Sequence, residues 1–114
     1  MKSYLVIFIG GGLGANLRYV ISLLVRGLSL KPWVATLAAN LIGCFLYFMF
    51  ERYLDILKSH NEFVRIGILG SLTTFSAFSY EVVMSYKSGK IEEAGMILFL
   101  NIFFGILIGI GILR

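Results

Sequence analysis

The chain has 114 residues, of which 59% are hydrophobic and 14% are charged, and its formal net charge is +4. A soluble globule of this size has too small an interior to hide so many apolar side chains, which disfavours a soluble enzyme domain or a secreted disulfide scaffold. The ten Lys and Arg residues are scattered between apolar runs rather than clustered, which argues against a nucleic-acid partner. The composition predicts a protein whose outer surface meets lipid.

Four apolar runs follow one another along the chain, and each is long enough to cross a bilayer. They cover about residues 4–25, 33–50, 63–86 and 91–113. The second run starts after Lys31 and Pro32, and Pro is well placed in the first turn of a helix. We therefore predict an all-α integral membrane protein with a single domain, residues 1–114, and four transmembrane helices.

The centre of the third run is unusually polar. Between Gly67 and Glu81 it contains two glycines, five Ser or Thr residues and one carboxylate. A helix break here would expose carbonyl groups that hold a cation and amide groups that favour an anion. The alternative is that the hydroxyl groups bond back to the preceding helical turn, as Ser and Thr often do in spans.

Two aromatic residues and two amides are further candidates. Phe75 and Phe78 are three positions apart and would project from similar faces of a helix, where their positive ring edges can face an anion without trapping it. Asn40 lies one turn after Thr36 in the second run, either as a bond between helices or as an amide donor in a pore. Asn101 interrupts the otherwise apolar fourth run.

Ionisable groups within the runs are costly in a membrane unless they find a partner or water. Arg18 is expected to reach a headgroup, an acidic partner or a pore entrance. Glu81 either pairs with a basic group or becomes neutral by protonation.

The basic residues that flank the runs give almost no orientation signal. Five lie on the side of the N-terminus, namely Lys2, Arg52, Lys58, Arg65 and Arg114. Four lie on the other side, namely Arg26, Lys31, Lys87 and Lys90. Because the bias of Lys and Arg sets membrane orientation, copies inserted both ways up are expected, and opposite copies can pair as an antiparallel dimer.

Two other motifs say less about function. The spacings Gly10-x-x-x-Gly14 and Gly105-x-x-x-Gly109 allow close helix approach, either within the chain or between subunits. The run from Gly10 to Ala15 matches a dinucleotide-binding pattern, but the strand and acidic residue which that site needs are missing. No hydrolytic or metal-ligating cluster stands out, so no enzymatic activity is predicted.

Three segments resemble the fluoride channel family (Fluc, or CrcB), and the similarity covers essentially the whole chain. They are Gly11-Gly12-Leu13-Gly14-Ala15-Asn16-Leu17-Arg18-Tyr19, Asn40-Leu41-Ile42-Gly43-Cys44-Phe45 and Gly70-Ser71-Leu72-Thr73-Thr74-Phe75-Ser76-Ala77-Phe78-Ser79-Tyr80-Glu81. The third segment is long and chemically unusual, so it is the most specific of the three. The resemblance implies four spans with a broken third helix, an antiparallel homodimer in the cell's inner membrane and two fluoride pores at the dimer interface.

The resemblance also implies roles for individual residues. The fluoride path would be lined by Asn40, Phe75, Phe78, Thr36, Ser79 and Asn101. Arg18 would lie near an aqueous entrance and Glu81 in the polar region at the far end. Backbone carbonyls of Gly70 and Thr73 would hold a structural sodium ion shared by both subunits. The implied activity is passive, electrogenic export of fluoride from the cytoplasm, which lowers fluoride toxicity.

The fourth run departs from the family pattern, in which a Tyr and a Ser are common. Ile97 and Asn101 stand at those points, with Gly105 one turn beyond. Two other functions compete with a channel. A small multidrug exporter would need an acid embedded in the first span, which has none, and a non-transporting assembly subunit would use the polar third helix only to hold helices together.

Overall fold

A computed structural model describes residues 2–54 and 60–114 as helices joined by short connections. The helices are α1 (Lys2–Gly27), α2 (Pro32–Tyr53), η2 (Glu62–Leu69), α3 (Gly70–Leu72), α4 (Phe75–Lys87) and α5 (Ile91–Leu113). Four stretches of the described residues, α1, α2, Glu62–Lys87 and α5, are long and apolar enough to cross a membrane. This confirms the prediction of an all-α chain with four spans. Lys58, one of the flanking basic residues, lies outside the described residues.

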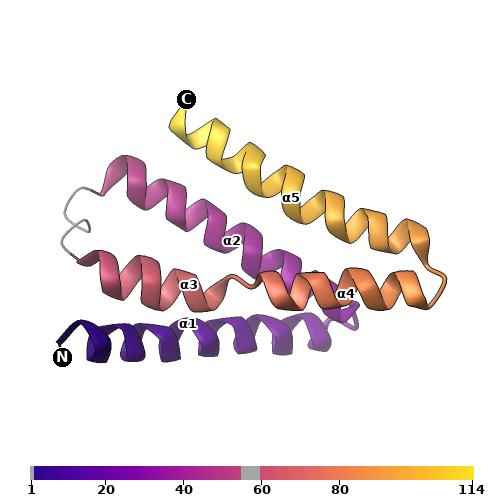
Figure 1. Ribbon diagram of the computed structural model, residues 1–114, viewed down its shortest axis with the longest axis horizontal. Coiled ribbons are helices and arrows are strands. Elements are labelled where there is room, and N and C mark those ends of the chain that lie inside the picture. The colour runs from indigo at the N-terminus through magenta and orange to yellow at the C-terminus, as the bar shows by residue number, and fades with distance from the viewer. Residues whose placement is uncertain (1, 55–59) are drawn as a thin grey trace.

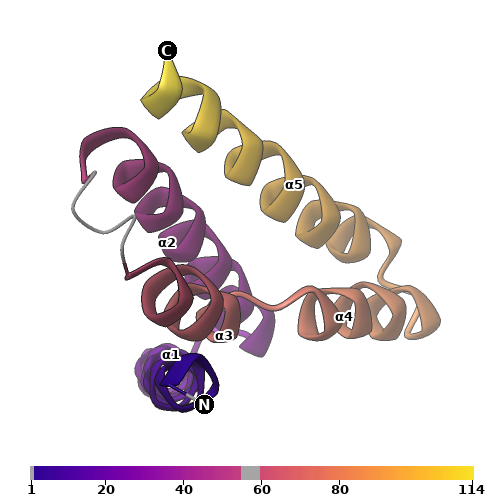
Figure 2. The same ribbon diagram turned by 60° about the vertical axis from the view of Figure 1, so that its left-hand side comes forward.

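The spans run alternately up and down (Figure 1). The N-terminus, the C-terminal end of α2, the start of η2 and the C-terminus of α5 lie toward one end, and the other two connections lie at the opposite end. Helix α1 packs along η2 and α3, whereas α5 packs on α2 and α4. The view in Figure 2 shows α1 and α5 on opposite sides of the molecule, with α2 and the third span between them. The third span therefore contacts every other helix.

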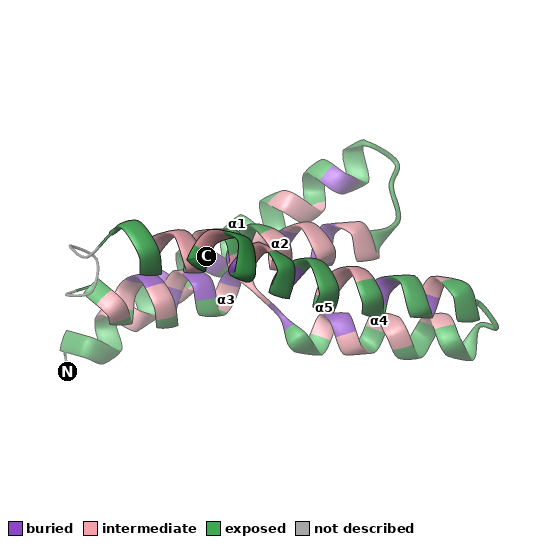
Figure 3. Ribbon diagram, turned by 90° about the horizontal axis from the view of Figure 1, so that it is seen from above, coloured by how far each residue is buried: buried purple, intermediate pink, exposed green. Residues whose placement is uncertain are grey.

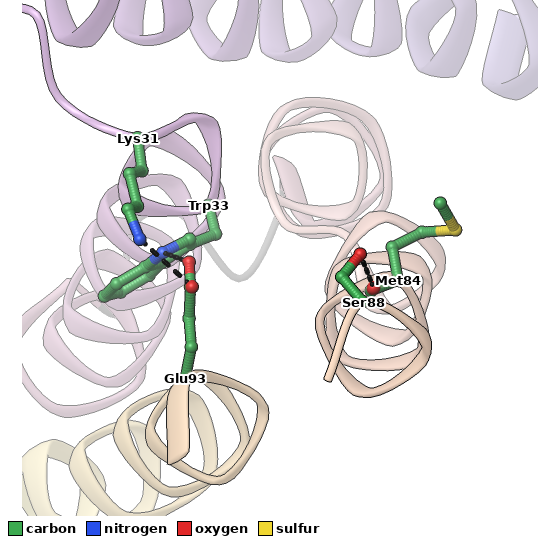
Figure 4. A network of polar contacts seen from close by, with 5 residues as sticks. All are labelled: Lys31, Trp33, Met84, Ser88 and Glu93. Atoms are coloured by element: carbon green, nitrogen blue, oxygen red, sulfur yellow. Dashed lines mark hydrogen bonds and ion pairs between the residues drawn. The ribbon is translucent and has the colours of Figure 1, made fainter. Parts of the chain in front are cut away.

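Polar contacts tie the helices together at both ends. At the start of α2, Lys31 Nζ lies 3.0 Å from Glu93 Oε2, and Trp33 Nε1 donates to Glu93 Oε1 at 2.8 Å (Figure 4). At the other end, Arg65 forms an ion pair with Glu51, and Arg52 donates to a backbone carbonyl of α5. These contacts hold α2 beside α5 at one end, and beside both α5 and η2 at the other.

Glycines let α1 approach the third span at backbone distance. A Cβ added at Gly14 would lie 2.1 Å from the carbonyl oxygen of Ile68, and one at Gly10 would lie 2.6 Å from that of Phe63. Gly67 presents the matching surface, because its own Cβ would lie 2.9 Å from the Cα of Gly10. The Gly10-x-x-x-Gly14 spacing is therefore used for packing within the chain.

Two glycines of α5 likewise allow a close approach to α2. A Cβ at Gly109 would lie 2.4 Å from the ring of Phe48, and one at Gly105 would lie 3.4 Å from the Sγ atom of Cys44. Both small-residue spacings thus lie at intrachain helix contacts, where small side chains permit the close approach on which membrane helix association depends.

Two extended residues separate α3 from α4 in the middle of the third span. Thr73 has φ −84° and ψ 148°, and Thr74 has φ −147° and ψ 116°. Helix α4 then begins at Phe75, with the side chain of Thr74 accepting the Ala77 N–H at 3.2 Å as an N-cap. Before α3 the span is a π-helix, η2, a rare form that is frequently found at functional sites.

Very little of the chain is buried. Leu69, Leu72 and Ile97 are at most 2% exposed, whereas large apolar side chains along α1 and α5 are widely exposed. Figure 3 shows the buried residues as short, scattered segments, while most of the ribbon is exposed or intermediate. An apolar outer surface of this extent is stable only against lipid or another apolar surface.

The contact at Gly14 gives a prediction about stability. The variant Gly14→Ala forces α1 away from the third span and should lower the free energy of unfolding by about 1–3 kcal/mol, the usual cost of overpacking. The measurement is thermal unfolding in detergent, followed by Trp33 fluorescence. Gly12→Ala is the matched control on the same helix, because a Cβ there meets nothing within 4 Å. Equal melting temperatures for both variants would contradict the packing described here.

Candidate functional site

The third span is interrupted at Thr73 and Thr74, where helical hydrogen bonds are lost. The side chain of Asn40 on α2 replaces two of them by bonding to the backbone of Thr74. Its Oδ1 accepts the Thr74 N–H at 2.8 Å, and its Nδ2 donates to the Thr74 carbonyl at 3.3 Å. Backbone groups at membrane depth must be satisfied within the protein, because lipid offers neither donors nor acceptors. One side chain therefore satisfies both backbone groups of Thr74 and makes the extended backbone tolerable there.

A second amide joins this group from the fourth span. Asn40 Nδ2 donates to Asn101 Oδ1 at 2.8 Å, and Asn101 Nδ2 donates to the Ile97 carbonyl of its own helix at 2.9 Å. The two amides link α2, the Thr74 backbone and α5, which are far apart in the sequence.

These amides open onto a cavity of about 280 Å³ together with both candidate phenylalanines. It is lined by Asn40, Cys44, Thr73, Thr74, Phe75, Phe78, Asn101 and Ile102. The rings of Phe75 and Phe78 lie edge to face, with centroids 5.6 Å apart. Phe78 is 6% exposed and Phe75 is 79% exposed, so one ring belongs to the chain's interior and the other projects from it. The cavity thus combines polar amides with aromatic ring edges.

Thr36, Glu81 and Arg18 lie on the other side of Thr74. Thr36 is buried, and its Oγ1 donates to Glu81 Oε1 at 2.6 Å, while Glu81 Oε2 is buried without a hydrogen-bond partner. A second cavity, of about 310 Å³, is lined by residues that include Arg18, Thr36 and Thr74. Thr74 therefore lies between the cavity of the two amides and a cavity that contains a guanidinium group.

Gly70 and Thr73 share a third cavity, of about 290 Å³, with Arg65. In a continuous helix the Gly70 carbonyl would accept the Thr74 N–H, but that group donates to Asn40 instead. Thr73 directs both its N–H, at 3.1 Å, and its Oγ1, at 2.9 Å, to the Leu69 carbonyl. The Gly70 carbonyl thus loses its helical donor, and a carbonyl of this kind suits a small hard cation.

A side-chain metal site is not seen in the part of the chain that the structure describes. No three His, Cys, Asp or Glu side chains are grouped there. Any cation at Gly70 and Thr73 would therefore depend on backbone oxygens.

The remaining predicted residues fall outside the first cavity. Ser79 is half-buried on α4 and does not line it. Ile97 is 0% exposed and Gly105 is buried against α2, so neither reaches the cavity from α5. Asn101 and the apolar Ile102 are the residues by which the fourth span contributes to it.

Sequence reasoning missed two contributors. It treated Thr74 as one hydroxyl of a cluster, but the backbone of this residue is what Asn40 binds. It also assigned no role to Cys44, although this thiol lines both the first and the third cavity. The sequence signal for Cys44 was its position on α2, one helical turn after Asn40.

This chain is similar to known proteins over nearly its full length. Residues 5–112 match the family described as CrcB-like protein, Camphor Resistance (CrcB). A protein of Phocaeicola vulgatus named fluoride-specific ion channel FluC is 39% identical over 94 residues, which are 78% of this chain and 77% of that protein. A protein of Roseobacter denitrificans with the same name is 36% identical over an alignment that covers 100% of this chain and 97% of that protein.

A further relative, from Pectobacterium atrosepticum, also carries the name fluoride-specific ion channel FluC and is 36% identical across 89% of this chain. These relatives are named as ion channels rather than as enzymes. With four helices able to span a membrane, this chain is a multi-pass membrane protein that belongs to the CrcB-like family.

Proposed function

We propose that the chain is the subunit of a fluoride-selective channel in the cell's inner membrane. It lets fluoride leave the cytoplasm passively, driven by the membrane potential, and so lowers fluoride toxicity. The names of the relatives support fluoride as the transported ion.

The observation that carries the proposal is the cavity where Asn40, Asn101, Phe75 and Phe78 meet. Fluoride is small and strongly hydrated, so its entry into a membrane protein is costly unless donors replace the lost water. Amide N–H groups and positive ring edges supply such replacement without a full positive charge, which would bind the ion too tightly to release it. Of the other predicted lining residues, Thr36 and Ser79 would extend the path beyond this cavity.

The two cavities on either side of Thr74 would form successive parts of the path. Arg18 lines the second cavity and would attract fluoride at an aqueous entrance. Glu81, held by Thr36, would mark the polar end of the path.

An antiparallel homodimer with two pores at its interface would complete the channel. Phe75 lines the cavity and is 79% exposed at the centre of a span, where a partner subunit would enclose it. The five and four flanking basic residues give no strong orientation bias, which is compatible with insertion both ways up.

A structural sodium ion at the dimer centre would use the backbone carbonyls of Gly70 and Thr73. Its support is that the helical donors to these carbonyls are engaged elsewhere: the Thr74 N–H donates to Asn40 instead of to Gly70, and the Ala77 N–H donates to Thr74 Oγ1 instead of to the Thr73 carbonyl. When bound, the ion would supply positive charge to the ends of two interrupted helices and hold them together.

One observation favours a second candidate, a non-transporting assembly subunit. Both protons of the Asn40 amide are engaged in bonds between segments, as expected for a residue that only holds helices together. The exporter alternative has no such support, because α1 contains no Asp or Glu.

Fluoride efflux from liposomes that contain the purified protein is the decisive test. With a potassium ionophore to balance charge, rapid fluoride release and little chloride release are expected, because the path selects a small, strong hydrogen-bond acceptor. Protein-free liposomes are the control. A well-folded protein that releases no fluoride would contradict the channel and favour the assembly subunit.

The ring edges give the second prediction. Phe75→Ile and Phe78→Ile should each slow fluoride efflux by about 2- to 10-fold, taking the about 0.5–1.5 kcal/mol of an aromatic pair as the scale of one ring-edge contact. Phe8→Ile is the matched control, because Phe8 on α1 is 78% exposed, as Phe75 is, and lines no part of the cavity. Unchanged flux in the double variant Phe75→Ile/Phe78→Ile would remove the rings from the path.

The sodium site gives the third prediction. Replacing sodium with a large organic cation at equal ionic strength should lower the melting temperature of the purified dimer, because a ligand that binds only the folded state stabilises it by mass action. The measurement is a sodium titration of thermal unfolding, with potassium as the parallel salt. A melting temperature that is indifferent to sodium would argue against a site at Gly70 and Thr73.

A further inference from the structure

The hydrogen-bond partners of Asn101 dictate which way its amide faces. One end of this amide lies 2.9 Å from the Ile97 carbonyl, which can only accept, so that end must be the nitrogen. The other end, which faces Asn40, is therefore the oxygen. Asn101 thus presents an acceptor, not a donor, to the neighbouring amide.

The same reasoning fixes Asn40. The end that faces the Thr74 N–H must be the oxygen, because that backbone group can only donate. The nitrogen of Asn40 then has two protons, of which one goes to the Thr74 carbonyl and the other to Asn101 Oδ1. In this structure the amide has no proton left for an anion.

The two hydrogen bonds of Asn40 Nδ2 differ in length and in the movement needed to break them. The bond to Thr74 measures 3.3 Å and ends on backbone within the extended segment. The bond to Asn101 measures 2.8 Å and ends on a side chain, which can rotate without any movement of the backbone. Asn101 is half-buried and lines the cavity, so its side chain has space beside it.

We propose that Asn101 Oδ1 is a placeholder for the anion, which occupies the donating proton of Asn40 while the cavity is empty and gives it up when fluoride enters. This inference rests on the proposed function, and it makes Asn101 a positioning residue rather than a donor to fluoride. The exchange offsets part of the binding free energy, so fluoride is held weakly enough to leave. Asn101 would thereby set the fluoride affinity of the path.

The placeholder and an ordinary pore donor predict opposite effects of the same substitution. If Asn101 donates to fluoride, its removal weakens fluoride binding. If it competes for the Asn40 proton, its removal leaves that donor unsatisfied and strengthens binding.

The test is the fluoride concentration that gives half-maximal efflux from liposomes, compared between wild type, Asn101→Leu and Asn101→Ala. Leu keeps the volume of the side chain and Ala does not, so a packing defect would separate the two variants. We expect the half-maximal concentration to fall by about 3- to 10-fold in both, the factor that one neutral hydrogen bond provides. The maximal rate should fall with it, because a more tightly held ion leaves more slowly.

Asn16→Leu is the matched control. Asn16 on α1 also donates to the carbonyl four residues earlier, at 2.7 Å, but it is exposed and lines no part of the cavity. Its half-maximal concentration should equal that of the wild type.

A half-maximal concentration that rises or stays unchanged in both Asn101 variants would overturn the placeholder role while leaving the channel in place. Absence of fluoride efflux from the wild type would overturn the proposed function, and the placeholder with it.

Discussion

The pairing of the Asn40 side chain with both backbone groups of Thr74 is the interaction on which the rest of the site depends. Thr73 and Thr74 interrupt a helix at a depth where lipid offers no hydrogen bonds, so the extended segment is stable only if the protein supplies partners. Asn40 supplies them from the neighbouring helix. Because it takes the Thr74 N–H, it also frees the Gly70 carbonyl, and one amide thereby connects the proposed anion path with the proposed cation site.

Close helix packing makes this pairing possible. Gly10 and Gly14 bring α1 to backbone contact with the third span, while Gly105 and Gly109 bring α5 against α2. Helices at these distances hold the Asn40 and Asn101 amides within 2.8 Å of each other. The polar contacts at the ends of the bundle, such as that of Lys31 with Glu93, also hold the helices close together. The glycine contacts and the half-buried amides therefore act together to fix the positions of the helices.

The proposed ion path depends on how polar groups are arranged around Thr74. On one side lie amides and ring edges, and on the other lie Arg18 and the Thr36–Glu81 pair. Phe75 projects from the surface of the single subunit, where the proposed partner subunit would cover it. The two amide nitrogens donate to oxygen atoms of the protein, and in the proposed path an anion would enter by exchanging with one of these bonds. Such exchange suits rapid passage better than an unoccupied, tightly binding site does.

The sequence by itself determined the four membrane spans, because hydropathy over about 20 residues is a local property. It also indicated the polar centre of the third span, Asn40 and Asn101, because polar groups at membrane depth stand out from their neighbours. Phe75 and Phe78 were indicated by their spacing within that polar centre. Only the tertiary structure decided that these four line one cavity, whereas Ser79, Ile97 and Gly105 do not. Partner choice depends on helix rotation and spacing, which are set by contacts between distant segments: Asn40 meets the Thr74 backbone, and Gly14 meets Ile68.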